Sequence, residues 1–359
     1  MKLALIGLGG YSGNLVMKEA EAYFSKIDFF DIRHVEVRAD KKEVEVLHKG
    51  NKIEDYDCVY IRGSFNYALL QRALAYAFKD SYVPMTPDSF GIGHDKFLTL
   101  MELQKANVSI PKTYLAGTTK IAKKLLEDVH YPIIMKIPSG TQGKGVMSAD
   151  SIASAKSMLD TLEVFKQPYI IQEYIETDAT DVRAIVAGGK VVAAMKRKGS
   201  TNERRSNIHQ GGSGVAYELS YDAEKAAIKS AKALKADICG VDILEDHKGI
   251  YVIEVNLSPG LRGITAATKK NIAKSVAKVL HDKTLEFKKV EKKNGYKDII
   301  KEMKTSHDKE VLMNLDIKGG RIRLPEMITK ITGFDSDDEI VLTADRGKLN
   351  IKKMEIEKD

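Results

Sequence analysis

The segment GVDILEDHKGIYVIEVN, from Gly240 to Asn256, predicts two strands joined by a tight turn at Asp246–Gly249. Asp242 and Glu254 lie at nearly equal distances from the centre of that turn, so we expect them to face each other across an antiparallel pair. Asn256 shares a face with Glu254 because strand side chains alternate. Opposed carboxylates need a positive charge between them, and oxygen ligands without His or Cys suit Mg²⁺ or Mn²⁺. The alternative is an exposed hairpin with incidental charges.

A glycine-rich loop lies upstream, in IPSGTQGKGV (Ile137–Val146), directly after the predicted strand Tyr131–Lys136. Its glycines at positions 140, 143 and 145 let backbone amides approach an anion closely. The spacing differs from the P-loop pattern, which needs Gly-Lys-Ser/Thr leading into a helix. We interpret the loop as a flexible lid over nucleotide phosphates, with Lys136 supplying a point charge. A mobile hairpin turn without ligand is the alternative.

Three smaller polar elements lie between and beside these motifs, and a solvated charged surface would also explain each of them. QEYI (Gln172–Ile175) ends a predicted strand where backbone and Glu173 could meet an adenine and a ribose. Asp181 and Arg183 lie two apart on the next predicted strand and therefore share a face. Arg197 and the later stretch RSN (Arg205–Asn207) can hold phosphate and carboxylate oxygens.

The first 90 residues alternate short apolar runs with helical patterns, which predicts a small, mostly parallel sheet covered by helices. The predicted strands are Lys2–Ile6, Asp31–Val37 and Val59–Arg62, and the predicted helices are Leu15–Tyr23 and Tyr67–Ala77. The turn GLGGYSG (Gly7–Gly13) has the position of a dinucleotide fingerprint, but Ser12 occupies the place of the third glycine. We therefore favour a tight turn without ligand, and nicotinamide chemistry is a minor alternative.

Composition places the chain among globular proteins, with 359 residues, 43% hydrophobic and 30% charged. No apolar run approaches the roughly 18 residues of a membrane-spanning helix. Cys58 and Cys239 lie in apolar runs, so we expect buried thiols and a reducing, cytoplasmic location. The net charge is +7, but residues 306–359 hold 10 Lys/Arg against 12 Asp/Glu. A mild positive excess elsewhere serves an anionic small molecule as well as a polynucleotide.

The order of the motifs resembles the RimK family of ATP-grasp carboxylate–amine ligases. The resemblance covers residues 1–282 and is densest from 94 to 261. It rests on the segments HDKFLTL (His94–Leu100), PIIMKIPSGTQGKGV (Pro132–Val146), IQEYIE (Ile171–Glu176), DVR (Asp181–Arg183), RRSNIHQGG (Arg204–Gly212), GVDIL (Gly240–Leu244) and VIEVNLSPGL (Val252–Leu261). It implies an α/β fold with a Rossmann-like pre-ATP-grasp domain, residues 1–90, and a two-subdomain ATP-grasp domain, residues 91–282.

The resemblance implies the roles of individual residues. The metal ions, Mg²⁺ or Mn²⁺ and two in number, fall on Asp242, Glu254 and Asn256, where the hairpin argument also places them. We assign catalysis to Arg183, Arg197 and Arg205. The expected ATP-binding residues are Lys96, Lys136, Gly143, Gly145, Gln172, Glu173, Tyr174, Ile175, Asp181, Arg205, Ser206 and Asn207.

The function implied by the resemblance is amide formation through an acylphosphate, with ADP and phosphate as products. The amino acid added is expected to be glutamate or a similar one, and the acceptor a protein, carrier protein or coenzyme. Substrate-side residues vary most within the family, so these motifs do not name the acceptor. The rival hypothesis is a DNA-associated regulator with a non-catalytic ATP-grasp part.

The C-terminal segment extends beyond the ligase-like part. Residues 283–305 are Lys-rich and predict a basic linker or helix. In residues 306–359, the stretches GRIRLPEMI (Gly320–Ile328), GFDSDDEIVL (Gly333–Leu342) and GKLNI (Gly347–Ile351) resemble a SpoVT/AbrB-type swapped-hairpin domain. Such domains often bind DNA as dimers, but the acidic balance of this tail argues against phosphate-backbone binding. We therefore expect homo-oligomerisation or protein docking, with neither DNA nor membrane as partner.

Overall fold

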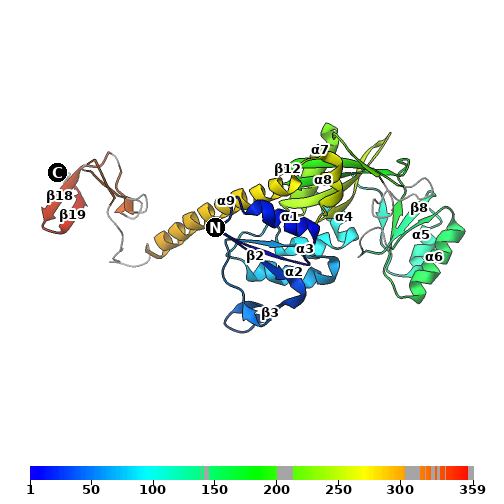
Figure 1. Ribbon diagram of the computed structural model, residues 1–359, viewed down its shortest axis with the longest axis horizontal. Helices are drawn as coiled ribbons and strands as arrows, with labels where there is room; N and C mark the ends of the chain where they lie inside the picture. Colours follow the sequence, from blue (N-terminus) through cyan, green and yellow to red (C-terminus); the bar gives the residue numbers. More distant parts are fainter. Residues whose placement is uncertain are drawn as a thin grey trace, which may run out of the picture. The chain divides into compact units, whose positions relative to one another are not determined.

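The computed structural model describes residues 1–138, 140, 145–199, 213–303, 316–319, 321–324, 328–329, 332–335 and 337–354. The chain divides into two compact units, Met1–Thr284 and Leu285–Asp359 (Figure 1). The first unit is a mixed α/β structure built on several sheets, which confirms the predicted fold class. The finer domain boundaries at residues 90, 282 and 305 stay predictions.

The N-terminal sheet has the strand order β2–β1–β6, with all strands parallel. β1 (Lys2–Gly7) is buried after its first residue, as its continuous apolar sequence predicts for a central parallel strand. β6 (Cys58–Ile61) is also fully buried. Helices α1 (Tyr11–Ala20) and α2 (Ala68–Ala77) follow these strands, α2 after a short 3₁₀ turn, η2 (Phe65–Tyr67). Both cysteines are buried free thiols, as expected.

The predicted strand Asp31–Val37 is wrong. β2 (Lys26–Asp31) ends in a 3₁₀ turn, η1 (Ile32–His34), whose first amide groups are capped by Asp31: its carboxylate accepts a hydrogen bond from the Arg33 backbone N at 3.0 Å. The chain then enters a separate antiparallel sheet of β3 (Val35–Ala39), β4 (Val44–His48) and β5 (Asn51–Lys52). A hydrogen bond from a nearby backbone N–H to an Asp side chain competes with strand pairing. The pattern of apolar residues does not reveal that competition.

The second sheet has the order β7–β10–β8–β9 and is antiparallel. Its strands are β7 (Thr113–Tyr114), β8 (Ile133–Lys136), β9 (Val146–Ala149) and β10 (Ile170–Glu173). Helices α5 (Thr119–Leu125) and α6 (Ile152–Val164) lie side by side along it (Figure 1). Met135 from the sheet and Leu126 and Leu159 from the helical layer share one buried core. The polar ends of β8 and β10 therefore belong to a rigid layer.

The third sheet contains the predicted hairpin and is antiparallel throughout, in the order β13–β12–β11–β14–β15. Its strands are β11 (Thr180–Ala187), β12 (Lys190–Lys198), β13 (Ser213–Ala216), β14 (Ile238–Asp246) and β15 (Gly249–Asn256). Gly188 and Gly189, with φ of +60° and +77°, form the turn between β11 and β12. Positive φ at both central residues is what a two-residue hairpin turn of this hand requires.

Further helices in the described part of the chain are α3 (Pro87–Gly93), α4 (Lys96–Lys105), α7 (Tyr221–Ala233), α8 (Arg262–Thr268) and α9 (Ile272–Met303). The start of α4 matters for the site. Asp95 caps it, because its Oδ1 accepts hydrogen bonds from the backbone N of Phe97 at 2.8 Å and of Leu98 at 2.9 Å. This cap fixes Lys96 as the first helical residue. None of the helices in the described ranges is long and apolar enough to cross a bilayer.

The second unit contains two hairpins, β16 (Asp316–Lys318) with β17 (Arg321–Arg323) and β18 (Ile340–Asp345) with β19 (Lys348–Lys353). Their apolar side chains are largely uncovered: Ile340 is 44% exposed, Leu342 56% and Leu349 47%. An exposed group of apolar side chains of this kind is typical of a surface that packs against another element or chain.

Candidate functional site

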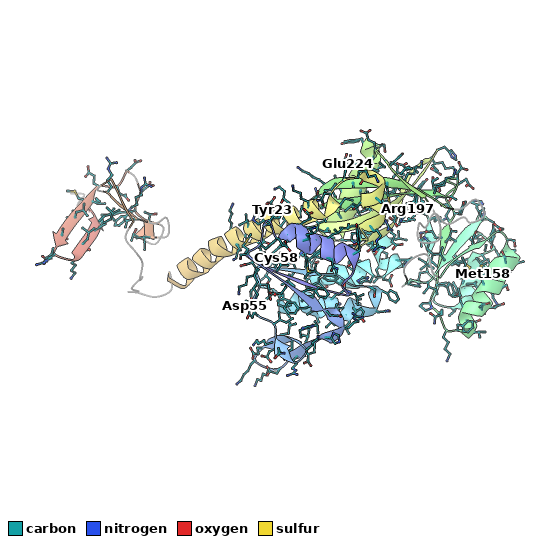
Figure 2. The ribbon with its side chains drawn as sticks, viewed as in Figure 1. Tyr23, Asp55, Cys58, Met158, Arg197 and Glu224 are labelled. Atoms are coloured by element: carbon teal, nitrogen blue, oxygen red, sulfur yellow. The ribbon has the colours of Figure 1, made fainter. Side chains whose placement is uncertain are left out.

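Four oppositely charged side chains form a row across the central strands of the third sheet. Asp181 on β11 lies opposite Arg197 on β12, and Arg183 on β11 lies opposite Asp242 on β14. Asp181 and Arg183 thus share a face, as predicted. Figure 2 marks Arg197 within this sheet. The row comes from segments far apart in the sequence, brought together by the strand order.

Two guanidinium groups hold the Asp242 carboxylate. Arg183 donates from Nε to Oδ1 at 2.7 Å and from Nη2 to Oδ2 at 2.6 Å. Nη2 of Arg197 lies 3.0 Å from Oδ2 of Asp242, and the same guanidinium pairs with both oxygens of Asp181. Burial favours the neutral acid, but the charges and hydrogen bonds of Arg183 and Arg197 outweigh it and hold the pKa of Asp242 well below its usual range.

Asp181 and Arg197 are the most deeply buried members of this row, with side chains 5% and 7% exposed. The Arg197 guanidinium binds both carboxylate oxygens of Asp181. The same guanidinium contacts Asp242, so the pair helps to fix the position of Asp242. The contact of Asp181 with ATP and the catalytic contact of Arg197 stay predictions. Arg183 is more accessible, at 17% exposed.

Glu254 faces Asp242 as predicted, and a β-bulge makes the pairing possible. Nearer the turn, Ile243 pairs with Val252, and the register then shifts so that Asp242 pairs with Glu254. Ile253 is the extra residue, and it accounts for the small offset between the turn centre and the midpoint of the two acids. Within the described ranges, no side chain forms a hydrogen bond or ion pair with the Glu254 carboxylate. Bulges of this kind commonly aim side chains next to active sites.

The donor set fits a hard divalent cation. Asp242 and Glu254 supply carboxylate oxygens, and Asn256 follows on the same face of β15. Oδ1 of Asn256 accepts a hydrogen bond from the Ser258 backbone N at 2.9 Å, which orients the amide and leaves a second lone pair on the oxygen. The described residues contain no cluster of three His, Cys, Asp or Glu side chains for a metal ion. An oxygen set with Asn as third member suits Mg²⁺ rather than a transition metal that prefers nitrogen or sulfur.

Lys136 lies at the end of β8 and is held by Gln172 on β10. Its Nζ donates to Gln172 Oε1 at 2.6 Å, and Gln172 Nε2 donates to Thr113 Oγ1 at 2.8 Å. Desolvation lowers the pKa of Lys136 to about 8; the charge of Glu254 opposes this shift and that of Lys96 adds to it. The Gln172 side chain is buried and orients the lysine, and the contact of Gln172 with ATP stays a prediction.

Lys96 is fixed against the beginning of the glycine loop. Its Nζ donates to the Gly140 carbonyl oxygen at 2.9 Å, and its backbone N donates to Pro138 O at 3.1 Å. At the other end of the loop, Gly145 has a φ of +76° and its carbonyl accepts a hydrogen bond from the Ile137 backbone N at 3.0 Å. Both ends of the loop are therefore anchored to β8 or α4.

The predicted adenine-binding segment lies at the end of β10. Glu173 is exposed there, Ile175 is buried, and the Glu173 backbone N donates to Lys112 O at 2.9 Å. Tyr174 follows between them. β10 ends at Glu173, and the chain continues from there into a loop, as predicted. The contacts of these residues with ATP stay predictions. Gly143 and the Arg205-Ser206-Asn207 triplet lie outside the described residues.

A pocket of about 50 Å³ adjoins Glu254 and Asn256, and its lining includes residues that sequence reasoning did not assign to the site. Its lining includes Gly63–Phe65 and His94 as well as Lys96 and Ile253–Leu257. His94 Nε2 lies 3.2 Å from Gln71 Oε1, and Gln71 Nε2 donates to Ser64 O at 2.9 Å. The available signal was the position of Gly63 two residues after β6, since ligands gather at the carboxyl ends of parallel strands.

The N-terminal glycine turn, Gly7–Gly13, forms a hydrogen bond with another segment of the same chain. Oγ of Ser12, the residue that replaces the third glycine, accepts a hydrogen bond from the Leu261 backbone N at 2.9 Å. Arg62 Nη2 donates to Pro259 O at 2.8 Å, and Gly63 N donates to Ser258 Oγ at 3.1 Å. The loop that follows Asn256 is therefore fastened to the N-terminal sheet at several points. Gly240 permits this approach, because a Cβ there would lie 3.0 Å from Cβ of Pro259.

Comparison with known proteins agrees with this architecture. A model of the RimK-like ATP-grasp domain matches residues 93–280. A probable alpha-L-glutamate ligase of Psychromonas ingrahamii is 35% identical over 274 residues, which cover 75% of this chain and 91% of that protein. A second one, from Pseudoalteromonas atlantica, is 33% identical over 289 residues, covering 79% and 96%.

Solved structures share the fold at low sequence identity. A RimK-domain ATP-grasp protein from Sphaerobacter thermophilus has a TM-score of 0.60 at 15% identity, with 78% of this chain and 99% of that chain covered. The ATP-grasp ligase PsnB, solved with a minimal precursor, Mg and ADP, has a TM-score of 0.61 at 18% identity, covering 79% and 98%. The fold, the domain match and the extent of identity to the curated ligases together show that the chain belongs to the RimK-like ATP-grasp family and is an ATP-dependent enzyme that forms carbon–nitrogen bonds.

Proposed function

We propose that this protein joins an amino acid, glutamate or a close analogue, to a carboxylate acceptor through an acylphosphate. The acceptor carboxylate attacks the γ-phosphorus of ATP and ADP leaves; the amine then attacks the acyl carbon and phosphate leaves, with loss of a proton from nitrogen. The names of the relatives, probable alpha-L-glutamate ligases, support glutamate as the amino acid. The acceptor is a protein, carrier-protein or coenzyme carboxylate.

The observation that carries this proposal is the convergence of anionic and cationic groups on one side of the third sheet. Asp242 and Glu254 are opposed on β14 and β15, and the charge of Glu254 acts on Lys136 at the end of β8. Lys136, protonated below about pH 8, supplies positive charge for a transferring phosphoryl group. We assign Arg183 and Arg205 to the same task.

The metal assignment follows from the donor set. Asp242, Glu254 and Asn256 would hold one or two Mg²⁺ or Mn²⁺ ions, and a bound ion supplies charge neutralisation between the phosphate oxygens. We assign the glycine loop, with Gly143 and Gly145, to covering the phosphates. Exclusion of water by such a cover protects an acylphosphate from hydrolysis. The remaining predicted nucleotide contacts, Lys96, Glu173, Tyr174, Ile175, Asp181, Ser206 and Asn207, are part of this proposal.

We further propose that the protein is a homo-oligomer through residues 306–359. The uncovered apolar side chains of β18 and β19 support this, because two isolated hairpins bury too little surface for independent stability.

The experiment that tests the activity uses the purified full chain with ATP, Mg²⁺, glutamate and a panel of acceptors. Mass spectrometry of the acceptors should show a gain of one or more glutamate residues, and ADP and phosphate should appear in equal amounts. Parallel reactions in which each of the other amino acids replaces glutamate identify the amino acid that the enzyme adds. ATP turnover that never depends on an amino acid or an acceptor would contradict the proposal.

A further inference from the structure

The charges around the proposed metal site are already balanced by the protein itself. Arg183 and Arg197 offset Asp181 and Asp242, and these pairs are in direct contact. The charge of Glu254 acts on both Lys136 and Arg183. A divalent cation binds to carboxylates because of their negative charge, and Asp242 already shares its charge with two guanidinium groups.

The Arg183 guanidinium occupies the atoms that a cation would need. It contacts Oδ1 and Oδ2 of Asp242 at 2.7 and 2.6 Å, as a planar fork matched to the carboxylate. The fork takes up one lone pair on each oxygen and Arg197 lies against Oδ2 as well, so a metal ion finds only part of the acceptor capacity of Asp242 open. The positive charges of the metal ion and the Arg183 guanidinium also repel each other, and partial burial of the site weakens the screening of that repulsion by water.

Arg183 is held by fewer partners than Arg197, because its fork contacts one carboxylate and the Arg197 guanidinium contacts two. Arg197 is bound to Asp181 through both carboxylate oxygens and is 7% exposed, whereas Arg183 is 17% exposed. The fork with Asp242 accounts for every hydrogen bond of the Arg183 side chain to another described residue. Movement of Arg183 would therefore open Asp242 while Arg197 and Asp181 keep the row in place.

We propose that Arg183 is a resident cation of the metal site: in the nucleotide-free protein it occupies Asp242 and keeps free divalent cations out, so that metal enters only together with nucleotide phosphates. This inference rests on the proposed function, which makes Asp242 and Glu254 metal ligands. A nucleotide polyphosphate brings the negative charge that the balanced site lacks. It also offers the displaced guanidinium a new anionic partner.

The test measures Mn²⁺ binding to the full chain by water-proton relaxation, which responds to protein-bound Mn²⁺. Wild-type protein should bind Mn²⁺ at least about tenfold more weakly without ADP than with it, because a nearby guanidinium repels a dication. Arg183→Met should bind Mn²⁺ without nucleotide at least about tenfold more tightly than wild type. Arg183→Lys, which keeps the charge but not the fork, should gain less.

Two further variants make the result specific. Arg72→Met removes the same charge at an exposed site, where Arg72 pairs with Asp88 at 2.8 Å, and should leave Mn²⁺ binding unchanged. Adding Asp242→Asn to Arg183→Met should abolish the gain, which places the new binding at Asp242. Thermal melting of each variant reports whether it is folded.

The inference is overturned if folded Arg183→Met gains no nucleotide-free Mn²⁺ binding while wild type with ADP binds Mn²⁺ in a Glu254-dependent way. In that case the proposed metal site itself stands. If Arg183→Met does not fold, wild type decides: equal Mn²⁺ affinity with and without ADP overturns the inference. Absence of Glu254-dependent Mn²⁺ binding under every condition would overturn the metal assignment together with this inference.

Discussion

The ammonium group of Lys136 is subject to two opposing influences, burial at the end of β8 and the negative charge of Glu254. Burial dominates, and the pKa falls to about 8. A bound polyphosphate favours the protonated form, so nucleotide binding takes up a proton whenever Lys136 is deprotonated in the free protein. The affinity for nucleotide therefore depends on pH in a range where other lysines stay charged.

We predict that ATP affinity is constant below about pH 8 and falls as the pH rises further, by up to tenfold for each unit, until the pKa of the complex is reached. Lys136→Arg keeps its charge throughout this range and should remove the dependence. Calorimetric titrations from pH 7 to 9.5 measure both proteins. Parallel curves for the two would contradict the assignment of the titration to Lys136.

Glu254→Gln should lower ligation by at least about a hundredfold and leave the fold intact. The carboxylate faces Asp242, and relief of like-charge repulsion is worth roughly 0.2–1 kcal/mol in favour of the variant. Glu224→Gln, on the exposed side of α7, is the matched control and should retain activity (Figure 2). Product formation and thermal melting measure the two effects. Full activity of Glu254→Gln at ordinary Mg²⁺ would rule out a metal ligand at this position.

At the scale of elements, the β14–β15 hairpin could be predicted because its pairing is local. The turn and the period of two place Asp242 against Glu254, and a single bulge at Ile253 does not change which residues meet. The fork between Arg183 and Asp242 could not be predicted, because it joins strands whose adjacency depends on the order of the whole sheet. Likewise, nothing local to Ser258 indicates that Gly63 donates to it.

The glycine loop gives a prediction at this scale. Gly145→Ala should weaken ATP binding without global unfolding, because Gly145 has a φ of +76° and a Cβ there would lie 2.9 Å from Ile137 Cδ1. Positive φ costs a non-glycine residue roughly 1–2 kcal/mol. Gly117→Ala is the control, since a Cβ at Gly117 meets nothing within 4 Å. Nucleotide titration and melting curves measure both variants. Unchanged affinity in Gly145→Ala would remove this end of the loop from nucleotide binding.

At the scale of the whole molecule, we predict that residues 306–359 hold copies of the chain together. Truncation after Lys304 should give a smaller species that still binds ATP, because the ATP-grasp match ends at residue 280. Light scattering coupled to size-exclusion chromatography measures both proteins, and nucleotide titration confirms that the shorter one is folded. A monomeric full-length chain, or an oligomeric state that truncation does not change, would exclude this role for the tail.

The hydrogen bond from the Leu261 backbone N to Ser12 Oγ needs a hydroxyl at position 12, whereas a dinucleotide-binding turn needs a glycine there. A third glycine at position 12 would complete the dinucleotide fingerprint, yet it would remove the hydroxyl that holds the loop leading away from Asn256. The sequence change that brings the turn nearer to a cofactor-binding motif is thus the one that loosens the ligase site. In this architecture the turn after the first β-strand holds the protein's own backbone through the Ser12 hydroxyl, although its position in the fold is that of a nucleotide-binding signature.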